Sequence, residues 1–258
     1  MFEFIIKDLS KEQLILLEET NLYPVENNFK NENYFALYGD NNVAEILNNF
    51  EISFIKKSIK QTGWEENWKQ YLKNGNLTEN LEYVFDRKFI NENTIYINPA
   101  MAFGTGTHAT TQIAAKLLEP IVENKKIVDV GCGSGILSIA SEKLGANKIA
   151  AFDIDATAMK NAKENINANN CKKIFYWTGT LKSLNRKFKP DVICANIISS
   201  VLYENKNDIF YHNPEYIVLS GILISEIDKF NSDFVPSNYI ILKHLKQTEW
   251  CGLLLQKI

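Results

Sequence analysis

The chain has 258 residues, of which 45% are hydrophobic and 23% are charged. This length and composition argue against disorder and suit one large α/β domain with a smaller second domain. The net charge is −3, and residues 1–60 hold ten acidic residues against six lysines. Because a nucleic-acid-binding lobe is usually basic, we expect no direct nucleic-acid binding, and the acidic N-terminal segment suits a basic protein partner better.

Targeting and metal signals are weak in this sequence. The start, MFEFIIKDLS, lacks the features of a signal peptide, and no stretch approaches the ~18 apolar residues of a membrane span. The cysteines form no CxxC pair, which fits a reducing compartment and predicts no metal site. We therefore expect a cytoplasmic monomer that does not contact membranes. The four cysteines are Cys132, Cys171, Cys194 and Cys251.

Residues 1–58 alternate between strand and helix patterns. Strands are expected in MFEFIIK, NYFALYG and ISFIKKSI, and helices in DNNVAEILNNF and in SKEQLILLEE, which Ser10 would cap. A unit this small with this alternation predicts a ferredoxin-like α+β domain. Residues 59–92 are expected to form a connector, in which Trp64 and Trp68 share one face of a helix and pack there.

From residue 93 to residue 258 the pattern changes to strands alternating with helices. Helices are expected in GILSIASEKLG, which Gly145 would end, and in DATAMKNAKENINANN, which Asp155 would cap. The alternation predicts a mostly parallel α/β sheet covered on both faces, with an antiparallel pair of strands at the end of the chain. The expected strands are KKIVDV, NKIAAFDI, KKIFYW, PDVICANII, EYIVLSGILI and the pair within NYIILKHLKQTEWCGLLLQKI.

The stretch VDVGCGSG joins the first of these strands to a helix. Gly131, Gly133 and Gly135 allow the backbone to pass close to a ligand, and the start of the helix offers free N–H groups. A dinucleotide-binding loop has the spacing GxGxxG, whereas this loop has GxGxG. The tighter spacing resembles the first motif of class I methyltransferases, which bind S-adenosylmethionine.

Two further polar residues stand at the ends of predicted strands. Asp153 ends the second strand, where a carboxylate can accept hydrogen bonds from both hydroxyls of a ribose; its alternative role, a helix cap, suits Asp155 better. Asn196 ends the fourth strand, in the crevice where open α/β sheets bind ligands. Its amide oxygen could hold a substrate amine, although an asparagine that merely closes a turn is the alternative.

Four motifs together, PAMAFGTGTHATT, VDVGCGSGIL, FDID and ANII, resemble the family of methyltransferases that modify ribosomal protein eleven of the large subunit. This resemblance implies a class I, Rossmann-like methyltransferase domain behind a small substrate-recognition domain, with S-adenosylmethionine as cofactor. It implies that the loop Phe103–Thr111 folds across the cofactor, with Thr107 near the transferred methyl group and the amine. The residues expected to contact the cofactor are Thr111, Gly131, Gly133, Asp153 and Asn196.

The expected activity is methyl transfer from S-adenosylmethionine to amino groups of that ribosomal protein, both the N-terminal α-amine and lysine ε-amines. Asn196 and Thr107 are the expected catalytic residues, and His108 is expected to shape the loop rather than to act as a base. Methylation of a lysine on another protein remains open, as does a non-catalytic cofactor-binding module. The GxGxG spacing argues against a nicotinamide oxidoreductase, and ANII lacks the prolines of glutamine and adenine methyltransferases.

Overall fold

The chain divides into two compact units, Met1–Tyr71 and Leu72–Ile258. Trp64, Trp68 and Phe103, which the sequence singled out, lie outside the residues that can be described. None of the helices in the described part of the chain is long and apolar enough to cross a membrane. The computed structural model describes residues 2–10, 13, 16–17, 20, 25–29, 32–39, 41–58, 73–98 and 104–258.

The first unit is built on a four-stranded antiparallel sheet with the strand order β2-β3-β1-β4. Helical residues at positions 13, 16 and 17 lie between β1 and β2 in the chain, and helix α2 lies between β3 and β4. This chain order and strand order are those of the ferredoxin-like fold, as the sequence predicted. The elements are β1 (Phe2–Ile6), β2 (Val25–Phe29), β3 (Glu32–Gly39), α2 (Asn41–Asn49) and β4 (Ile55–Ser58).

Strand alternation explains the core of this unit. Phe4 and Ile6 point to one face of β1 and are fully buried, together with Leu47 of α2. Ser10 and Gln13 exchange two hydrogen bonds of 3.1 Å, from each backbone N–H to the other side chain. This reciprocal arrangement is a capping box, and it confirms Ser10 as a helix cap.

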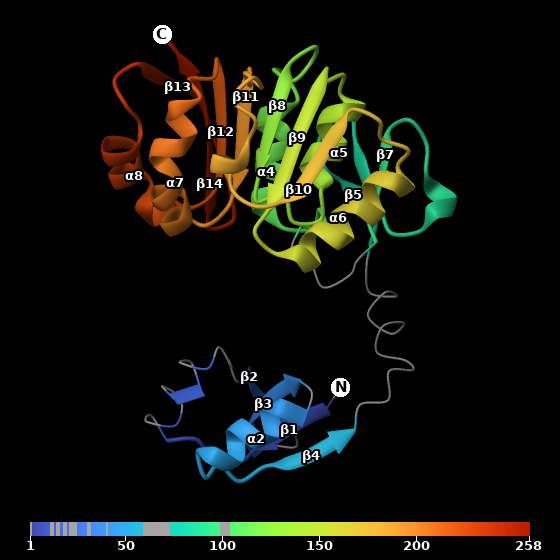
Figure 1. The fold of residues 1–258 in the computed structure, drawn as a ribbon, viewed down its shortest axis with the longest axis vertical. Helices are drawn as coiled ribbons and strands as arrows, with labels where there is room; N and C mark the ends of the chain where they lie inside the picture. The colour runs from blue at the N-terminus through green and yellow to red at the C-terminus, as the bar shows by residue number, and fades with distance from the viewer. Residues whose placement is uncertain are drawn as a thin grey trace. The chain divides into compact units, whose positions relative to one another are not determined.

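The second unit contains a seven-stranded sheet with the order β10-β9-β8-β11-β12-β14-β13 (Figure 1). The first five of these strands are parallel, and β14 runs antiparallel between β12 and β13. The sheet is therefore the mostly parallel, doubly covered sheet that the sequence predicted, with the expected antiparallel pair at its end. Its strands are β8 (Lys126–Val130), β9 (Lys148–Asp153), β10 (Ile174–Thr178), β11 (Val192–Asn196), β12 (Tyr216–Leu223), β13 (Tyr239–Gln247) and β14 (Trp250–Lys257).

Helices cover both faces of this sheet. Helices α4, α5 and α6 bury apolar side chains in one core, and α7 and α8 bury theirs in a second core on the other face (Figure 1). The helices are α4 (Ala109–Leu118), α5 (Ile136–Lys143), α6 (Ala156–Ala168), α7 (Ser199–Tyr211) and α8 (Ile227–Phe234), with 3-10 turns η2 (Arg87–Phe89), η3 (Leu181–Ser183) and η4 (Ile224–Glu226).

A small sheet of three strands precedes α4 in the chain. Its strands are β5 (Gly75–Asn76), β6 (Glu82–Val84) and β7 (Thr94–Tyr96), and the first two lie within residues 59–92, which the sequence indicated as a connector. Leu77, Leu81 and Ile95 are buried in the same core as α4, α5 and α6. These strands have two or three residues each, which is too short for a period of two to be visible in the sequence.

Candidate active site

A cleft of about 760 Å³ opens where the parallel strands β8, β9 and β11 end. Ligands of open α/β sheets bind at this edge. The cleft brings together four of the residues that the sequence singled out, from three segments of the chain, and it also includes His108. Those four residues are Gly131, Gly133, Asp153 and Asn196.

The turn between β8 and α5 is held in a conformation that requires glycine. Gly131, Gly133 and Gly135 have φ values of +66°, +53° and +81°, in the left-handed region. A Cβ atom on Gly131 would lie 2.7 Å from Ile197 Cγ2, so a side chain there would also clash. Helix α5 begins after Gly135, which has no side chain to cap it, and the N–H of its first residue, Ile136, donates to Ser134 Oγ at 3.3 Å.

Asp153 is fixed at the end of β9 by two backbone donors. The N–H of Gly133 donates to its Oδ2 at 3.0 Å, and the N–H of Asp155 donates to its Oδ1 at 3.0 Å. Two carboxylate oxygens offer about four acceptor positions, so each oxygen of Asp153 keeps the capacity for one more hydrogen bond. Asp155 is the N-cap of α6, accepting from Thr157 N at 2.7 Å, which confirms the separate capping role expected for it.

Asn196 has an unusual arrangement at the end of β11. Its Nδ2 donates to Thr111 Oγ1 at 3.3 Å, which fixes the side-chain amide. Its Oδ1 is buried and has no hydrogen-bond partner in the part of the chain that the structure describes. Because a buried acceptor without a donor is destabilising, this oxygen is suited to a donor on a ligand.

The two threonines expected at the site lie in different settings. Thr111 is fully buried in the first turn of α4 and reaches the cleft through Asn196, without lining it. Thr107 is exposed, lies outside the cleft lining, and shares a 2.8 Å hydrogen bond with Thr105 through their hydroxyl oxygens. Thr111 is thus placed to orient Asn196, whereas Thr107 stands on a loop beside the cleft.

The glycine-rich loop Gly104–Thr107 is held by side chains from its neighbours. Ser134 Oγ donates to Gly104 O at 2.5 Å, and Gln112 Nε2 donates to Gly106 O at 3.1 Å. His108 is the N-cap of α4, with Nδ1 within 2.8 Å of the hydroxyl of Thr110. A cap fixes the direction in which the chain leaves the loop, which agrees with a shaping role for His108.

The family model for ribosomal protein L11 methyltransferases (PrmA) matches residues 5–258 of this sequence. The chain belongs to this family. A relative from Thermoanaerobacter pseudethanolicus, named ribosomal protein L11 methyltransferase, is 33% identical over 93% of this chain and 83% of its own length. A relative with the same name from Streptococcus equi subsp. zooepidemicus is 32% identical over 80% of this chain and 68% of its own length.

A solved structure agrees with this assignment. The ribosomal protein L11 methylase of Lactobacillus delbrueckii subsp. bulgaricus is 29% identical, with a TM-score of 0.64 over 72% of this chain and 99% of that chain. The seven-stranded sheet and its helices are thus the class I methyltransferase fold, as the sequence predicted.

In this member of the L11 methyltransferase family, three asparagines on one face of α6 anchor the chain that leads toward the glycine-rich loop. Asn169 exchanges two hydrogen bonds with the backbone of Tyr96, at 2.9 and 2.7 Å. Asn165 accepts from Asn98 N at 2.8 Å. Asn161 donates to Asn98 O at 3.3 Å. Residues 96–98 are therefore tied to the rigid helix just before the segment that enters the loop.

One of these asparagines also links the two glycine-rich loops. Asn165 is fully buried and donates through Nδ2 to Ser134 O at 2.9 Å, while Ser134 Oγ holds Gly104. The sequence analysis missed this role, because asparagines four residues apart on a helix can equally be solvent-exposed. Only the fold shows that this polar face is buried.

Asp129 is a second carboxylate of the glycine turn that the sequence analysis did not consider. It is buried in β8, and Ser138 Oγ donates to its Oδ2 at 2.5 Å. Burial raises the pKa of Asp129 to about 6, and the nearby charge of Asp153 acts in the same direction. Burial likewise raises the pKa of the Cys132 thiol well above its usual range, so this cysteine is not a thiolate at neutral pH.

Gly221 is a further cleft residue that the sequence analysis missed. It lies at a β-bulge in β12 with a φ of +89°, and a Cβ atom there would approach Ile197 O to 2.3 Å. A glycine inside an apolar strand is the signal that could have found it. Among the residues that the structure describes, no cluster of His, Cys, Asp or Glu is arranged to hold a metal ion.

Proposed function

We propose that this protein transfers methyl groups from S-adenosylmethionine to amino groups of ribosomal protein L11, at the N-terminal α-amine and at lysine ε-amines. The observation that carries the proposal, in a chain of this family, is that Asn196 lines the cleft and has a buried Oδ1 without a partner among the described residues. S-adenosylmethionine supplies an activated methyl group on a sulfonium, so the protein mainly has to align the amine and exclude water.

The residues of the cleft suit this cofactor. A side chain on Gly131 would clash with Ile197, and the positive φ values of Gly131 and Gly133 favour glycine, so the bare backbone of this turn would be able to approach the cofactor closely. Asp153 has acceptor capacity for the two ribose hydroxyls in addition to its backbone donors. Thr111 would keep the amide of Asn196 in one orientation.

Asn196 would hold the substrate amine and direct its lone pair. The amine must be neutral to attack, and the free energy of deprotonation at pH 7 is about 4.6 kcal/mol for a lysine of pKa ~10.4. For an α-amine of pKa ~7.8 the corresponding free energy is only about 1 kcal/mol. Desolvation beside the positive sulfonium would lower the pKa of a lysine acceptor, and Thr107 would offer a further hydrogen bond from the glycine-rich loop.

We further propose that residues 1–58 recognise the L11 substrate, that residues 59–92 connect them to the catalytic part, and that residues 93–258 carry the methyl transfer. The acidic balance of the N-terminal segment suits a basic ribosomal protein. Deletion of residues 1–58 should preserve S-adenosylmethionine binding and greatly reduce methylation of L11. Full activity of the shortened enzyme on L11 would refute a recognition role.

We infer that the protein works as a monomer in the cytoplasm. The rival activity is methylation of a lysine on a different protein. Incubation with labelled S-adenosylmethionine and separated ribosomal proteins, followed by mass mapping of the labelled peptides, distinguishes the two. Label in L11 supports the proposal, and label confined to another protein contradicts it.

Calorimetric titration of Asp153→Ala with S-adenosylmethionine tests the cofactor site. The variant should lose roughly 1–3 kcal/mol of binding free energy, the scale of an unpaired polar group. Asp155→Ala is a matched control, because this neighbouring carboxylate caps α6: it should lower the free energy of unfolding by ~1 kcal/mol and leave cofactor affinity unchanged. Unchanged affinity in Asp153→Ala would remove Asp153 from the site.

A further inference from the structure

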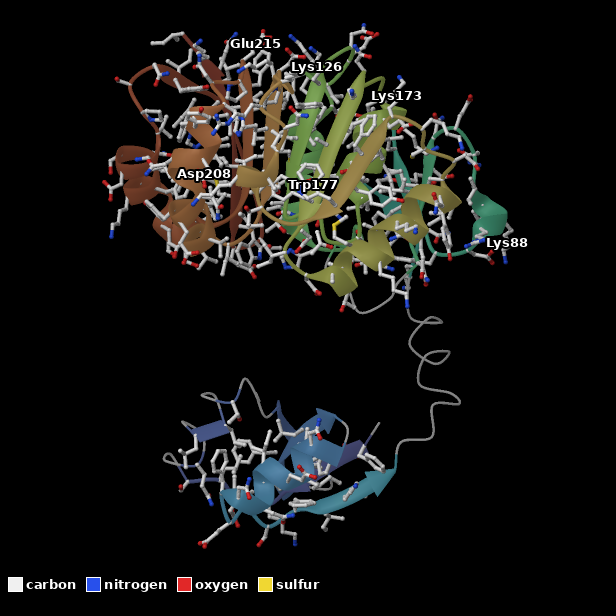
Figure 2. The ribbon with its side chains drawn as sticks, viewed as in Figure 1. Lys88, Lys126, Lys173, Trp177, Asp208 and Glu215 are labelled. Atoms are coloured by element: carbon white, nitrogen blue, oxygen red, sulfur yellow. The ribbon has the colours of Figure 1, made fainter. Side chains whose placement is uncertain are left out.

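A second cleft, of about 440 Å³, lies in the same unit and shares no lining residue with the candidate active site. We call it the lysine–aromatic cleft. It includes the residues with which β8 and β9 begin, and Figure 2 shows Lys126 at that end of the sheet and Trp177 farther along β10. The cleft is lined by four lysines and three aromatic residues: Lys126, Lys148, Lys187, Lys189, Phe175, Trp177 and Phe188.

The four lysines are exposed, and none of them forms an ion pair within the described residues. Lys126 and Lys148 are direct neighbours in the register of β8 and β9. Like charges side by side on paired strands are destabilising, so this pair of lysines suits an anionic partner. One carboxylate adjoins these lysines: Asp191 Oδ2 accepts a hydrogen bond from the backbone N–H of Lys126 at 2.7 Å.

The aromatic residues of the cleft differ in exposure. Phe175 on the edge strand β10 is 53% exposed, and the ammonium of Lys148 lies 4.6 Å from the centre of its ring. Trp177 follows two residues later on the same face, packs against Phe152, and donates from Nε1 to Ser183 Oγ at 2.7 Å. Trp177 is thus a fixed part of the wall, while the ring of Phe175 remains accessible beside a cation.

We propose that the lysine–aromatic cleft binds single-stranded RNA. Lysines that track phosphates, combined with an exposed aromatic ring on which a base can stack, are the elements with which proteins bind single strands. The exposed ring favours RNA over an acidic protein segment, because every base has a face to stack whereas a carboxylate does not. The expectation of no nucleic-acid contact came from the acidic residues 1–60, whereas these lysines come together only in the folded second unit. The proposal does not depend on methyl transfer.

The test is fluorescence anisotropy of the full-length protein with a fluorescein-labelled, mixed-sequence 12-nucleotide RNA between 50 and 200 mM KCl. Each phosphate contact on a single strand contributes about −0.7 to the slope of log K against log salt, so four lysines predict a slope near −2.8. Lys148→Glu/Lys187→Glu should weaken binding at least tenfold and reduce the magnitude of the slope by about 1.4.

The control is Lys243→Glu/Lys246→Glu on β13, which changes the net charge equally at exposed positions outside the cleft. It should change affinity less than twofold. Equal losses in the two double variants would overturn the proposal, as would the absence of RNA binding at 50 mM KCl. Methyl transfer to L11 and thermal unfolding, measured on the same samples, show that each variant is folded.

The stacking role is tested separately with Phe175→Ala. It should weaken RNA binding about tenfold and leave the salt slope unchanged, since no charge is lost. Phe89→Ala is the matched control. Phe89 is 47% exposed and the ammonium of Lys88 lies 4.9 Å from the centre of its ring, but Phe89 lies outside the cleft, so this substitution should not change RNA affinity. Competition by poly-glutamate as effective as by unlabelled RNA would assign the cleft to an acidic protein partner and overturn the RNA proposal.

Discussion

The two glycine-rich loops beside the active-site cleft are held in different ways. In the turn Gly131–Gly135, the side-chain bonds of Asp153 and Asn165 add to backbone bonds from Cys132 N to Phe152 O and from Gly135 N to Cys132 O, at 3.0 and 2.8 Å. The loop Gly104–Thr107 is instead held through two carbonyl oxygens, by the side chains of Ser134 and Gln112. The first loop is continuous with β8 and α5, whereas the second is held by side chains of neighbouring segments.

This difference separates two tasks. In the proposed site the backbone-held turn would offer a fixed surface for the cofactor, because its glycine conformations and its bond to β9 restrain it. The side-chain-held loop can readjust when one bond is lost, which would suit a loop that contacts the substrate rather than the cofactor. We call the turn Gly131–Gly135, with the strand ends around it, the fixed half of the site, and the loop Gly104–Thr107 the adjustable half. Substitutions in the fixed half should therefore change stability or turnover more than substitutions in the adjustable half.

The largest effect is expected on the pH dependence of stability, and it concerns Asp129, which lies in β8 just before the fixed turn. Burial raises its pKa from 3.8 to about 6 in the folded protein. The folded state therefore holds its proton more tightly than the unfolded state, and the free energy of unfolding falls as pH rises from about 4 to about 6. At ~1.36 kcal/mol per pH unit the decrease is about 3 kcal/mol, and Asp129→Asn should abolish it.

Urea unfolding at pH 4, 5, 6 and 7 measures this difference. Other carboxylates contribute equally to both proteins and cancel in the comparison. Asp155→Asn is the control for the substitution itself, because asparagine also caps helices and Asp155 is exposed; its free energy of unfolding at pH 7 should match that of the wild type. Parallel curves for the wild type and Asp129→Asn would contradict a buried carboxylate with a raised pKa.

Asn196→Ala is expected to lower turnover at least about a hundredfold, since small misplacements of a reacting group can have effects of that size. Asn231→Ala is a matched control, because Asn231 also has a buried Oδ1 without a partner in the described residues, yet it does not line the cleft. The measurement is the steady-state rate of L11 methylation by the two variants and the wild type, with circular dichroism to verify that each is folded. A fully active Asn196→Ala enzyme would overturn the site assignment.

The sequence pointed to both glycine-rich loops, but not to the contacts that hold the second of them. Each strand of the large sheet is a local apolar run, and its polar last residue, such as Asp153 or Asn196, marks the cleft because parallel strands end together. Asn165 and Asn169 bond to residues 67 and 73 positions away, so their role arises only in the fold. Helix α7 was not predicted, because only two of its residues, Leu202 and Ile209, are buried and two positions do not form a visible apolar period.

Gln112→Ala tests whether the adjustable loop depends on its outside support. Gln112 holds Gly106 O and is itself held by Gln247 Nε2 at 2.7 Å. Loss of one such positioning bond should lower turnover about tenfold at most, the scale of a net hydrogen bond, with S-adenosylmethionine affinity unchanged. Gln256→Ala, which loses a 3.4 Å bond to Tyr216, should change neither quantity. A large loss of cofactor affinity in Gln112→Ala would show that the loop belongs to the fixed half.

The smallest effect is expected for Thr107→Ala on the exposed part of the loop. Gly104 and Gly106, with φ values of +98° and +90°, give the loop freedom to compensate, so we expect a loss of about twofold to tenfold. The loss should be greater for lysine acceptors than for the N-terminal amine, because lysine must also release a proton at a higher free-energy cost. Single-turnover rates on peptides that carry only one acceptor type measure both losses. Thr107→Ser, which keeps the hydroxyl, should restore the rate, whereas the similarly shaped Thr107→Val should not. Equal losses on both acceptor types would contradict the proton argument while leaving the cofactor site intact.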